Sequence, residues 1–394
     1  MTETIESLRR ARFTSHVVFM ANGVVLGSWA PRIPEVKAEL GLSAGVLGVD
    51  LLALAVGALI TMPMTGGWAG RVGSAAATRI TAIAFFAAAV TIGLAFDAVT
   101  LFVALLLTGA GMGALDVSMN AQAVTVERAY GRSLMSGIHA TFSLGALLGA
   151  GAGAAGAAWH VDLLVQLAVL CVVLLGVVLL LSGSMLPDPP GEAQEPGPLL
   201  VRPRGPQVAL AAAAFAVLLC EGSAADWSAV YLRDGLGAGV AAGAAFAAFS
   251  ATMTIGRLVG DRALAGRPRR VVIRRFTLVA AVGLGLGLAV AELTDGTVSV
   301  VAAVAGFGVL GAGLSLTFPA LLAEAGAGSA RPAEAIGAVA TGGYTGFLVG
   351  PPVIGAVAET AGLPAAMWLI PVLAAGAALA VSGRHSGVSD AGVS

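Results

Sequence analysis

Twelve apolar segments constrain this chain more than any other feature of its sequence. Each is about 20 residues long, the length with which an α-helix crosses the ~30 Å hydrocarbon core of a membrane. With 58% hydrophobic residues, 11% charged residues and a mean hydropathy of +0.93, the chain carries too much apolar surface for a water-soluble fold. The sequence therefore predicts an all-α membrane protein. The expected spans are residues 13–31, 45–65, 77–97, 100–126, 131–158, 161–184, 207–232, 238–260, 271–292, 298–325, 333–358 and 363–382.

A polar stretch divides these segments into two groups of six. Residues 186–206, "LPDPPGEAQEPGPLLVRPRGP", are rich in proline and acidic residues. We predict an N-terminal six-helix bundle over residues 1–185, a cytoplasmic linker over 186–206 and a C-terminal six-helix bundle over 207–394. An internal repeat favours this division, since "GALLG" and "GFLVG" both fall in the fifth span of their half, at 145–149 and 346–350. Two similar bundles related by a pseudo-two-fold axis form a known transporter architecture.

The basic residues orient the spans. When the N-terminus is placed in the cytoplasm, 18 of the 21 Lys and Arg residues fall in cytoplasmic segments, which is the bias that membrane proteins show. The prediction is thus a multi-pass protein with both termini in the cytoplasm. Lys37 is the one lysine among these residues, a usage typical of a GC-rich bacterial genome. We therefore expect the bacterial cytoplasmic (inner) membrane.

A loop motif in the second half resembles a known family. "GRLVGDR" at 256–262 is similar to the cytoplasmic loop motif of the major facilitator superfamily (MFS). The resemblance implies the MFS fold, with twelve transmembrane helices in two pseudo-symmetric six-helix bundles. It also implies a cytoplasmic gate formed by Asp261, Arg262 and Arg257. The first half departs from the motif, because Gly70 stands where the aspartate is expected.

Four further segments resemble a narrower group, the YbjJ-like bacterial permeases, a branch that is similar to fucose:proton symporters. This resemblance covers essentially the whole chain and implies a transporter of small solutes. The segments are "NGVVLGSWAPRIPEVK" at 22–37, "GALDVSMNAQAVTVER" at 113–128, "SGIHATFSLG" at 136–145 and "EGSAADWSAVYLRD" at 221–234.

Several polar residues fall near the middle of the membrane. A charged side chain there costs about 2.5–3.5 kcal/mol on insertion scales, so such residues usually face a partner or a water-filled cavity. Asp116 lies about 15 Å and His139 about 12 Å from the cytoplasmic edge, so the two side chains are expected at similar depth. Asn22 and Glu221 lie near the same level, and Asn120 shares the helical face of Asp116. We predict that these five residues line a central cavity, which the MFS resemblance also implies.

Structural roles stay open for some of these residues. Asn22 and Asn120 are equally consistent with hydrogen bonds that hold helices together in the membrane. Asp116 has the alternative of a purely structural partnership with His139.

Two acidic residues nearer the outer surface are expected to have surface roles. Asp226 with Trp227 is interpreted as an interfacial aromatic residue beside a hydrated acid. Asp50 is expected to pair with Arg32 or Lys37 rather than to take part in coupling.

Several function classes lack their sequence motifs. No GxxxxGK[ST] loop is present, which excludes direct ATP driving by this chain. No HExxH motif occurs, and no His or Cys spacing suits a metal. The net charge of −1 gives no basic field for nucleic acid. We therefore predict a protein that is not an enzyme and has no cofactor or metal.

The resulting prediction is a secondary active transporter that works by alternating access as a monomer in the lipid bilayer. Its substrate is a small polar solute, with a preference for a sugar or related metabolite that comes from the branch resemblance. Protons supply the energy: Asp116 and Glu221 load and release them, and His139 tunes Asp116. Trp29 and Phe142 either stack on a sugar ring or serve as packing. Two alternatives remain, a proton antiporter that exports drugs or metabolites and a non-transporting membrane sensor or scaffold.

Overall fold

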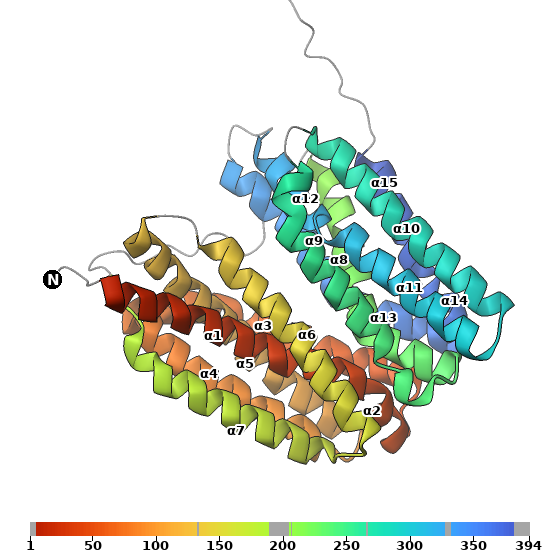
Figure 1. Ribbon diagram of the computed structural model, residues 1–394, viewed down its shortest axis with the longest axis horizontal. Helices are drawn as coiled ribbons and strands as arrows, with labels where there is room; N and C mark the ends of the chain where they lie inside the picture. The colour runs from red at the N-terminus through yellow and green to blue at the C-terminus, as the bar shows by residue number, and fades with distance from the viewer. Residues whose placement is uncertain are drawn as a thin grey trace, which may run out of the picture.

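The computed structural model describes residues 5–131, 134–188, 205, 207–264, 267–327 and 332–381. Within these residues every regular element is a helix (Figure 1). Nine described segments are long and apolar enough to cross a membrane, and Ala244–Val259 is a shorter apolar helix. Two long helices that are richer in polar residues, glycine or proline, α1 (Ile5–Trp29) and α13 (Pro332–Ala361), complete a set of twelve spans.

The first half of the chain forms six spans. Short helical turns, η1 (Ala30–Arg32), α2 (Ile33–Glu39), η2 (Thr91–Leu94) and η3 (Ser182–Ser184), extend three of them. The long helices are α1, α3 (Ala44–Val72), α4 (Ser74–Val90), α5 (Ala98–Tyr130), α6 (Met135–Ala158) and α7 (Leu163–Leu181).

The second half repeats this pattern with α8 (Gln207–Val230), η4 (Tyr231–Gly235), η5 (Gly239–Ala241), α9 (Ala244–Leu264), α10 (Arg269–Leu293), α11 (Gly296–Leu314), α12 (Thr317–Ala327), α13, α14 (Leu363–Met367) and α15 (Leu369–Val381). Each of the twelve predicted spans coincides with one of these helices or with two consecutive ones. The predicted all-α membrane fold is confirmed.

The internal repeat corresponds to equivalent helix packing in the two halves. A Cβ atom added at Gly145 of α6 would lie 2.2 Å from the carbonyl oxygen of Met20 in α1. At Gly346 of α13 it would lie 2.0 Å from the carbonyl oxygen of Phe215 in α8. Glycine at both positions allows the helix backbones to approach closely, as small residues do in membrane proteins.

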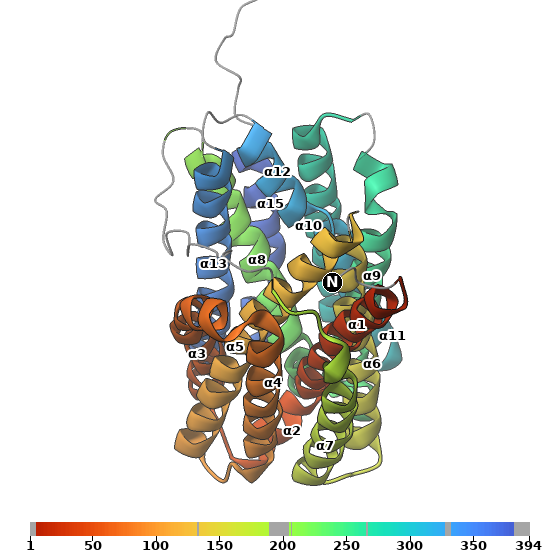
Figure 2. The same ribbon diagram turned by 90° about the vertical axis from the view of Figure 1, so that its left-hand side faces the viewer.

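The helices form two groups, α1–α7 and α8–α15, that lie side by side and diverge toward the upper left of Figure 1. We call the side of the molecule at which α1 begins the N-side, and the opposite side the far side. The helices run roughly parallel, and α2 lies at the far side while α12 ends at the N-side (Figure 2). The groups contact each other mainly through α3 against α13 and α6 against α9.

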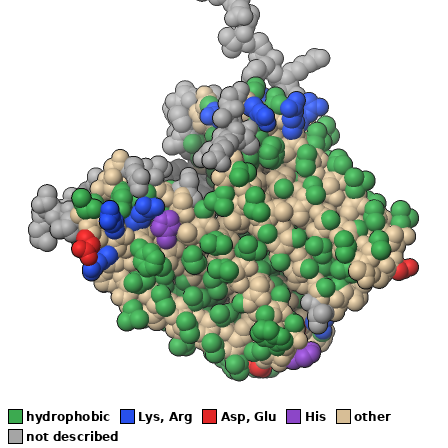
Figure 3. Space-filling model, viewed as in Figure 1, with side chains coloured by type: hydrophobic (Ala, Val, Ile, Leu, Met, Phe, Trp, Pro, Cys, Tyr) green, Lys and Arg blue, Asp and Glu red, His purple; other side chains and the backbone are tan. Residues whose placement is uncertain are grey.

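The outer surface carries hydrophobic side chains over a broad middle region, while the charged side chains gather toward the ends of the helices (Figure 3). Leu180 and Val172 of α7, for example, are 85% and 70% exposed. Exposed apolar surface of this extent is expected where lipid is the solvent.

The linker expected over residues 186–206 is described only at residues 186–188 and 205. Asp188 is bound to the N-side ends of two helices, since its carboxylate accepts hydrogen bonds from Ser74 Oγ (2.5 Å) and Thr125 Oγ1 (2.8 Å). The start of this segment is therefore fixed to α4 and α5. The predicted domain boundaries remain predictions.

Candidate substrate cavity

A cavity of 260 Å³ lies between the two groups of helices. Its lining comes from both halves of the chain and is predominantly apolar. The aromatic members are Trp29, Phe142, Phe246, Phe249 and Phe347, and methionine, leucine and alanine side chains fill the space between them. A concave, largely apolar site with a few polar groups is what a small organic ligand requires. A larger open groove, of 1060 Å³, lies on the N-side surface between α1 and η3, away from the contact between the two groups.

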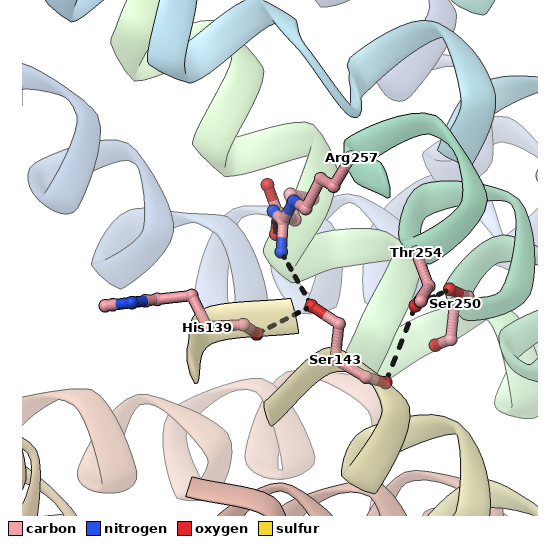
Figure 4. Close-up of polar contacts among 6 residues, drawn as sticks. His139, Ser143, Ser250, Thr254 and Arg257 are labelled. Atoms are coloured by element: carbon pink, nitrogen blue, oxygen red, sulfur yellow. Dashed lines mark hydrogen bonds and ion pairs between the residues drawn. The ribbon is translucent and has the colours of Figure 1, made fainter. Parts of the chain in front are cut away.

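An ion pair lies in the wall of the cavity. Arg257 Nη2 of α9 is 3.1 Å from Glu221 Oε1 of α8, and Arg257 Nη1 donates to Ser143 Oγ of α6 at 3.4 Å (Figure 4). Thr254 Oγ1, one turn away on α9, donates to the carbonyl oxygen of Ser143 at 3.5 Å. These contacts join the two halves of the protein at the cavity. Glu221, predicted as a site residue, therefore lines the cavity together with Arg257.

Arg257 was expected at a cytoplasmic gate together with Asp261 and Arg262. In this structure its guanidinium group lies at the cavity instead, bound to Glu221 and Ser143. The side chains of Asp261 and Arg262 lie outside the described residues, so their gate role remains a prediction.

Three polar side chains lie one helical turn on the N-side of the cavity. Asp116 is four residues past the cavity-lining Met112 on α5, and His139 is four residues before Ser143 on α6. Residues at this spacing share a helix face. His139 lies near Asp116, and the Tyr344 side chain of α13 lies near both Asp116 and Glu221. These residues form a polar layer at the N-side mouth of the cavity.

Asn120, predicted to share the helical face of Asp116, is hydrogen-bonded to it. Asn120 Nδ2 donates to both the backbone carbonyl oxygen (2.8 Å) and Oδ1 (3.1 Å) of Asp116. His139 is near Asp116 but does not bind it. Its Nδ1 is 3.0 Å from the carbonyl oxygen of Met135, and its ring packs edge-to-face on Phe19 at 5.1 Å.

Asn22 is placed away from the cavity. Its side chain is buried in the first half, where Nδ2 lies 3.8 Å from Met119 Sδ of α5. This position favours the alternative reading of Asn22 as a residue that holds α1 against α5.

The structure corrects the expectation for Asp226 and Trp227. Trp227 is fully buried, not interfacial, and Asp226 lines the cavity. The reason is that the helical course of α8 continues through η4 to Gly235, so Asp226 lies more than two turns before its end. Asp226 is thus a site residue that sequence reasoning missed. The sequence feature that could have indicated it is its position on the same helix as Glu221, five residues further along the chain.

The expected pairing of Asp50 with Arg32 or Lys37 is also wrong. Arg32 forms an ion pair with Glu35 at 2.6 Å, and Lys37 forms one with Asp234 at 2.6 Å. Asp50 is buried in α3, and its Oδ2 has no hydrogen-bond partner among the described residues. Asp50 does not line the cavity.

The far side of the cavity is closed by contacts between the two halves. Lys37 of α2 pairs with Asp234 of η4, and Glu359 Oε2 of α13 accepts a hydrogen bond from the backbone N–H of Gly45 at 3.0 Å. Gly48 packs so closely on α13 that an added Cβ would lie 2.8 Å from the carbonyl oxygen of Pro351. No group of three or more His, Cys, Asp or Glu side chains suited to a metal occurs in the described part of the chain.

Two helical bundles around a central cavity that is closed at one side define the transporter class of membrane protein. A family model described as Major Facilitator Superfamily matches residues 13–332, and the chain belongs to this superfamily. The chain is 36% identical over 363 residues to an uncharacterized MFS-type transporter of Yersinia pestis. The aligned region covers 91% of this chain and 92% of that protein.

Solved structures share the fold. The crystal structure of the nucleoside transporter NupG matches with a TM-score of 0.73 and 13% identity, over 94% of this chain and 98% of that one. The crystal structure of the human organic anion transporter MFSD10 matches with a TM-score of 0.67 and 15% identity, over 95% of this chain and 99% of that one. At such low identity these likenesses concern the fold alone.

Proposed function

We propose that this MFS protein moves a small organic solute across the bacterial cytoplasmic membrane by alternating access, driven by protons. The observation that carries the proposal is the cavity between the bundles, closed at the far side by contacts between them and bordered by ionisable groups. In this proposal the N-side is the cytoplasm, which agrees with the arginine-rich starts of α1 and α10. The structure then corresponds to a state closed toward the outside.

The cavity supports a solute with an apolar face. Trp29 and Phe142, whose role was open between sugar stacking and packing, both line it. Aromatic rings of this kind suit a sugar ring as well as other flat or apolar bodies. The preference for a sugar, and the likeness to the YbjJ-like permeases and fucose:proton symporters, stay within this proposal as one candidate class.

Proton coupling is assigned to the acids at the cavity and its mouth. Asp116 with Asn120 lies at the N-side mouth, and Glu221 with Arg257 lies in the wall. A proton on Glu221 would weaken its ion pair with Arg257, and with it the link to Ser143 in the other bundle. Such a link ties protonation to the relative position of the two bundles. The monomeric state is part of the same proposal.

The test begins with a binder. A thermal-shift screen of the purified protein against a metabolite panel identifies one, because a ligand that binds the native state stabilises it by mass action. The binder is then applied to proteoliposomes that enclose a pH-sensitive dye. A solute gradient should drive a change in internal pH in the wild type.

Asp116→Asn and Glu221→Gln should each reduce that pH change at least tenfold, whereas Asp295→Asn, at an exposed site between α10 and α11, should leave it unchanged. Full proton movement in both site variants would refute the assignment of these carboxylates. Solute movement without any pH change in the wild type would refute proton coupling itself. A bound solute that never crosses the membrane would refute transport. Comparison of uptake with efflux in whole cells separates an importer from the alternative of a proton-driven exporter.

A further inference from the structure

The charged groups that line the cavity do not balance. Glu221 and Asp226 are acidic and Arg257 is basic. The guanidinium group of Arg257 is already bound to Glu221 and to Ser143 Oγ. Among the described residues, Asp226 has no hydrogen bond or ion pair. The cavity therefore presents one carboxylate that a bound molecule has to satisfy.

The surroundings of this carboxylate are apolar and aromatic. Asp226 lies five residues beyond Glu221 on α8, about 7.5 Å further toward the far side, where the cavity is closed. The lining there includes Trp29 of α1 and Phe246 and Phe249 of α9. Aromatic faces attract cations, and this attraction is larger when the cation is removed from water. An unpaired carboxylate beside aromatic rings is a recognition site for a positive charge.

We propose that the solute bound in this cavity is an organic ammonium cation with an apolar body about the size of an aromatic ring. Its ammonium group binds the Asp226 carboxylate, and its body packs on Trp29, Phe246 and Phe249. This inference rests on the proposed transport function and names the substrate class of that same cavity.

Other charge classes fit the cavity less well. An anionic solute would meet Asp226 as a like charge, and it would have to compete with Glu221 for Arg257. A neutral solute would leave the Asp226 carboxylate buried without a counter-charge, which is costly in an apolar site. A cation makes the whole set neutral, with two positive and two negative groups.

The experiment uses three probes that share a phenyl ring and a two-carbon chain but differ in charge: 2-phenylethylammonium, 2-phenylethanol and 3-phenylpropionate. Thermal unfolding of the full-length protein is followed while each probe is titrated. The ammonium probe should raise the melting temperature in a saturable way, and the other two should have at least tenfold weaker apparent affinity.

Two isosteric variants make the assignment specific. Asp226→Asn should weaken binding of 2-phenylethylammonium at least tenfold. Asp50→Asn is the matched control, because Asp50 is likewise an acid of a membrane helix without a partner among the described residues, but it does not line the cavity. It should bind the probe as the wild type does.

Equal binding of the neutral or anionic probe, undiminished binding by Asp226→Asn, or no binding of the ammonium probe would each overturn the substrate class. These outcomes are distinct from failure of the transport proposal. If the cation binds at Asp226 but proteoliposomes do not accumulate it, the cavity's ligand class stands and transport of it fails. If a neutral or anionic metabolite is transported equally by the wild type and Asp226→Asn, transport stands and this inference fails.

Discussion

At the scale of single residues, burial and partners separate the acids of this protein into different roles. Glu221 is paired with a cation, Asp116 is held by an amide, and Asp226 and Asp50 have no partner among the described residues. The unpaired acids differ in turn, because Asp226 faces a cavity and Asp50 does not. Whether an acid of this protein faces the cavity thus depends on how its helix packs and not on its depth in the membrane.

The ion pair of Glu221 and Arg257 gives a prediction at this scale. Glu221→Gln and Arg257→Gln should each destabilise the protein, since each leaves a partly buried charge without its partner. The double variant should lose less stability than the two single variants lose together. We expect a coupling energy of about 0.5–2 kcal/mol, because the side chains of Glu221 and Arg257 are 22% and 36% exposed and solvent screens their charges. Denaturant unfolding of the four proteins in the cycle measures this coupling. Strict additivity would show that the pair does not form.

At the scale of helices, much of the structure was predictable from the sequence. In lipid a backbone satisfies its hydrogen bonds only within a helix or a closed barrel, so twelve apolar runs predict twelve helices. Helix spacing also predicted that Asp116 and Asn120 share one helical face, and the two are hydrogen-bonded there. The contact of Arg257 with Glu221 was not predictable in this way, because it depends on how α8 packs on α9. Asp226 was misplaced for a related reason: the helical course of α8 runs on through η4, and no residue in the sequence marks that.

The repeated glycines give a prediction at this scale. Gly346→Ala should destabilise the protein by about 1–3 kcal/mol, because the added methyl group meets the backbone of α8 and forces α13 outward. Gly176→Ala in α7 is the control, since nothing lies within 4 Å of an added Cβ there. That change should be neutral or slightly stabilising, as alanine favours helix more than glycine does. Denaturant unfolding compares the two, and equal effects would mean that α13 does not pack on α8 as described.

At the scale of the whole molecule, the far side is held closed by few polar contacts. The ion pair of Lys37 with Asp234 and the hydrogen bond from Gly45 to Glu359 each join one bundle to the other. A change in either contact is therefore expected to shift the balance between states closed and open at the far side.

Glu359 makes this balance depend on pH. Its exposed side chain lies near the far-side end of α13, just beyond the membrane span that the sequence predicts over residues 333–358. The hydrogen bond from the Gly45 backbone, with smaller contributions from the Ser43 side chain and from Lys37, lowers the pKa of the Glu359 carboxyl from its ordinary value of 4.5. A lowered pKa in the closed state means that the carboxylate form stabilises closure. This stabilisation is fully present above pH 4.5 and is lost as the pH falls through the lowered pKa.

Spin labels at Glu39→Cys and Ala361→Cys, both exposed at the far side, report on this closure. The two native cysteines, Cys171 and Cys220, are buried and therefore compete little for the label. The distance between the labels should lengthen in part of the population as the pH is lowered from 7 to values below the lowered pKa of Glu359. Glu359→Gln cannot ionise, so it should show the longer distance at pH 7 already and little further change on acidification. If the labels stay at one distance in both proteins across this range, the hydrogen bond from Gly45 to Glu359 does not control the far side, and closure depends on the packing of Gly48 against Pro351.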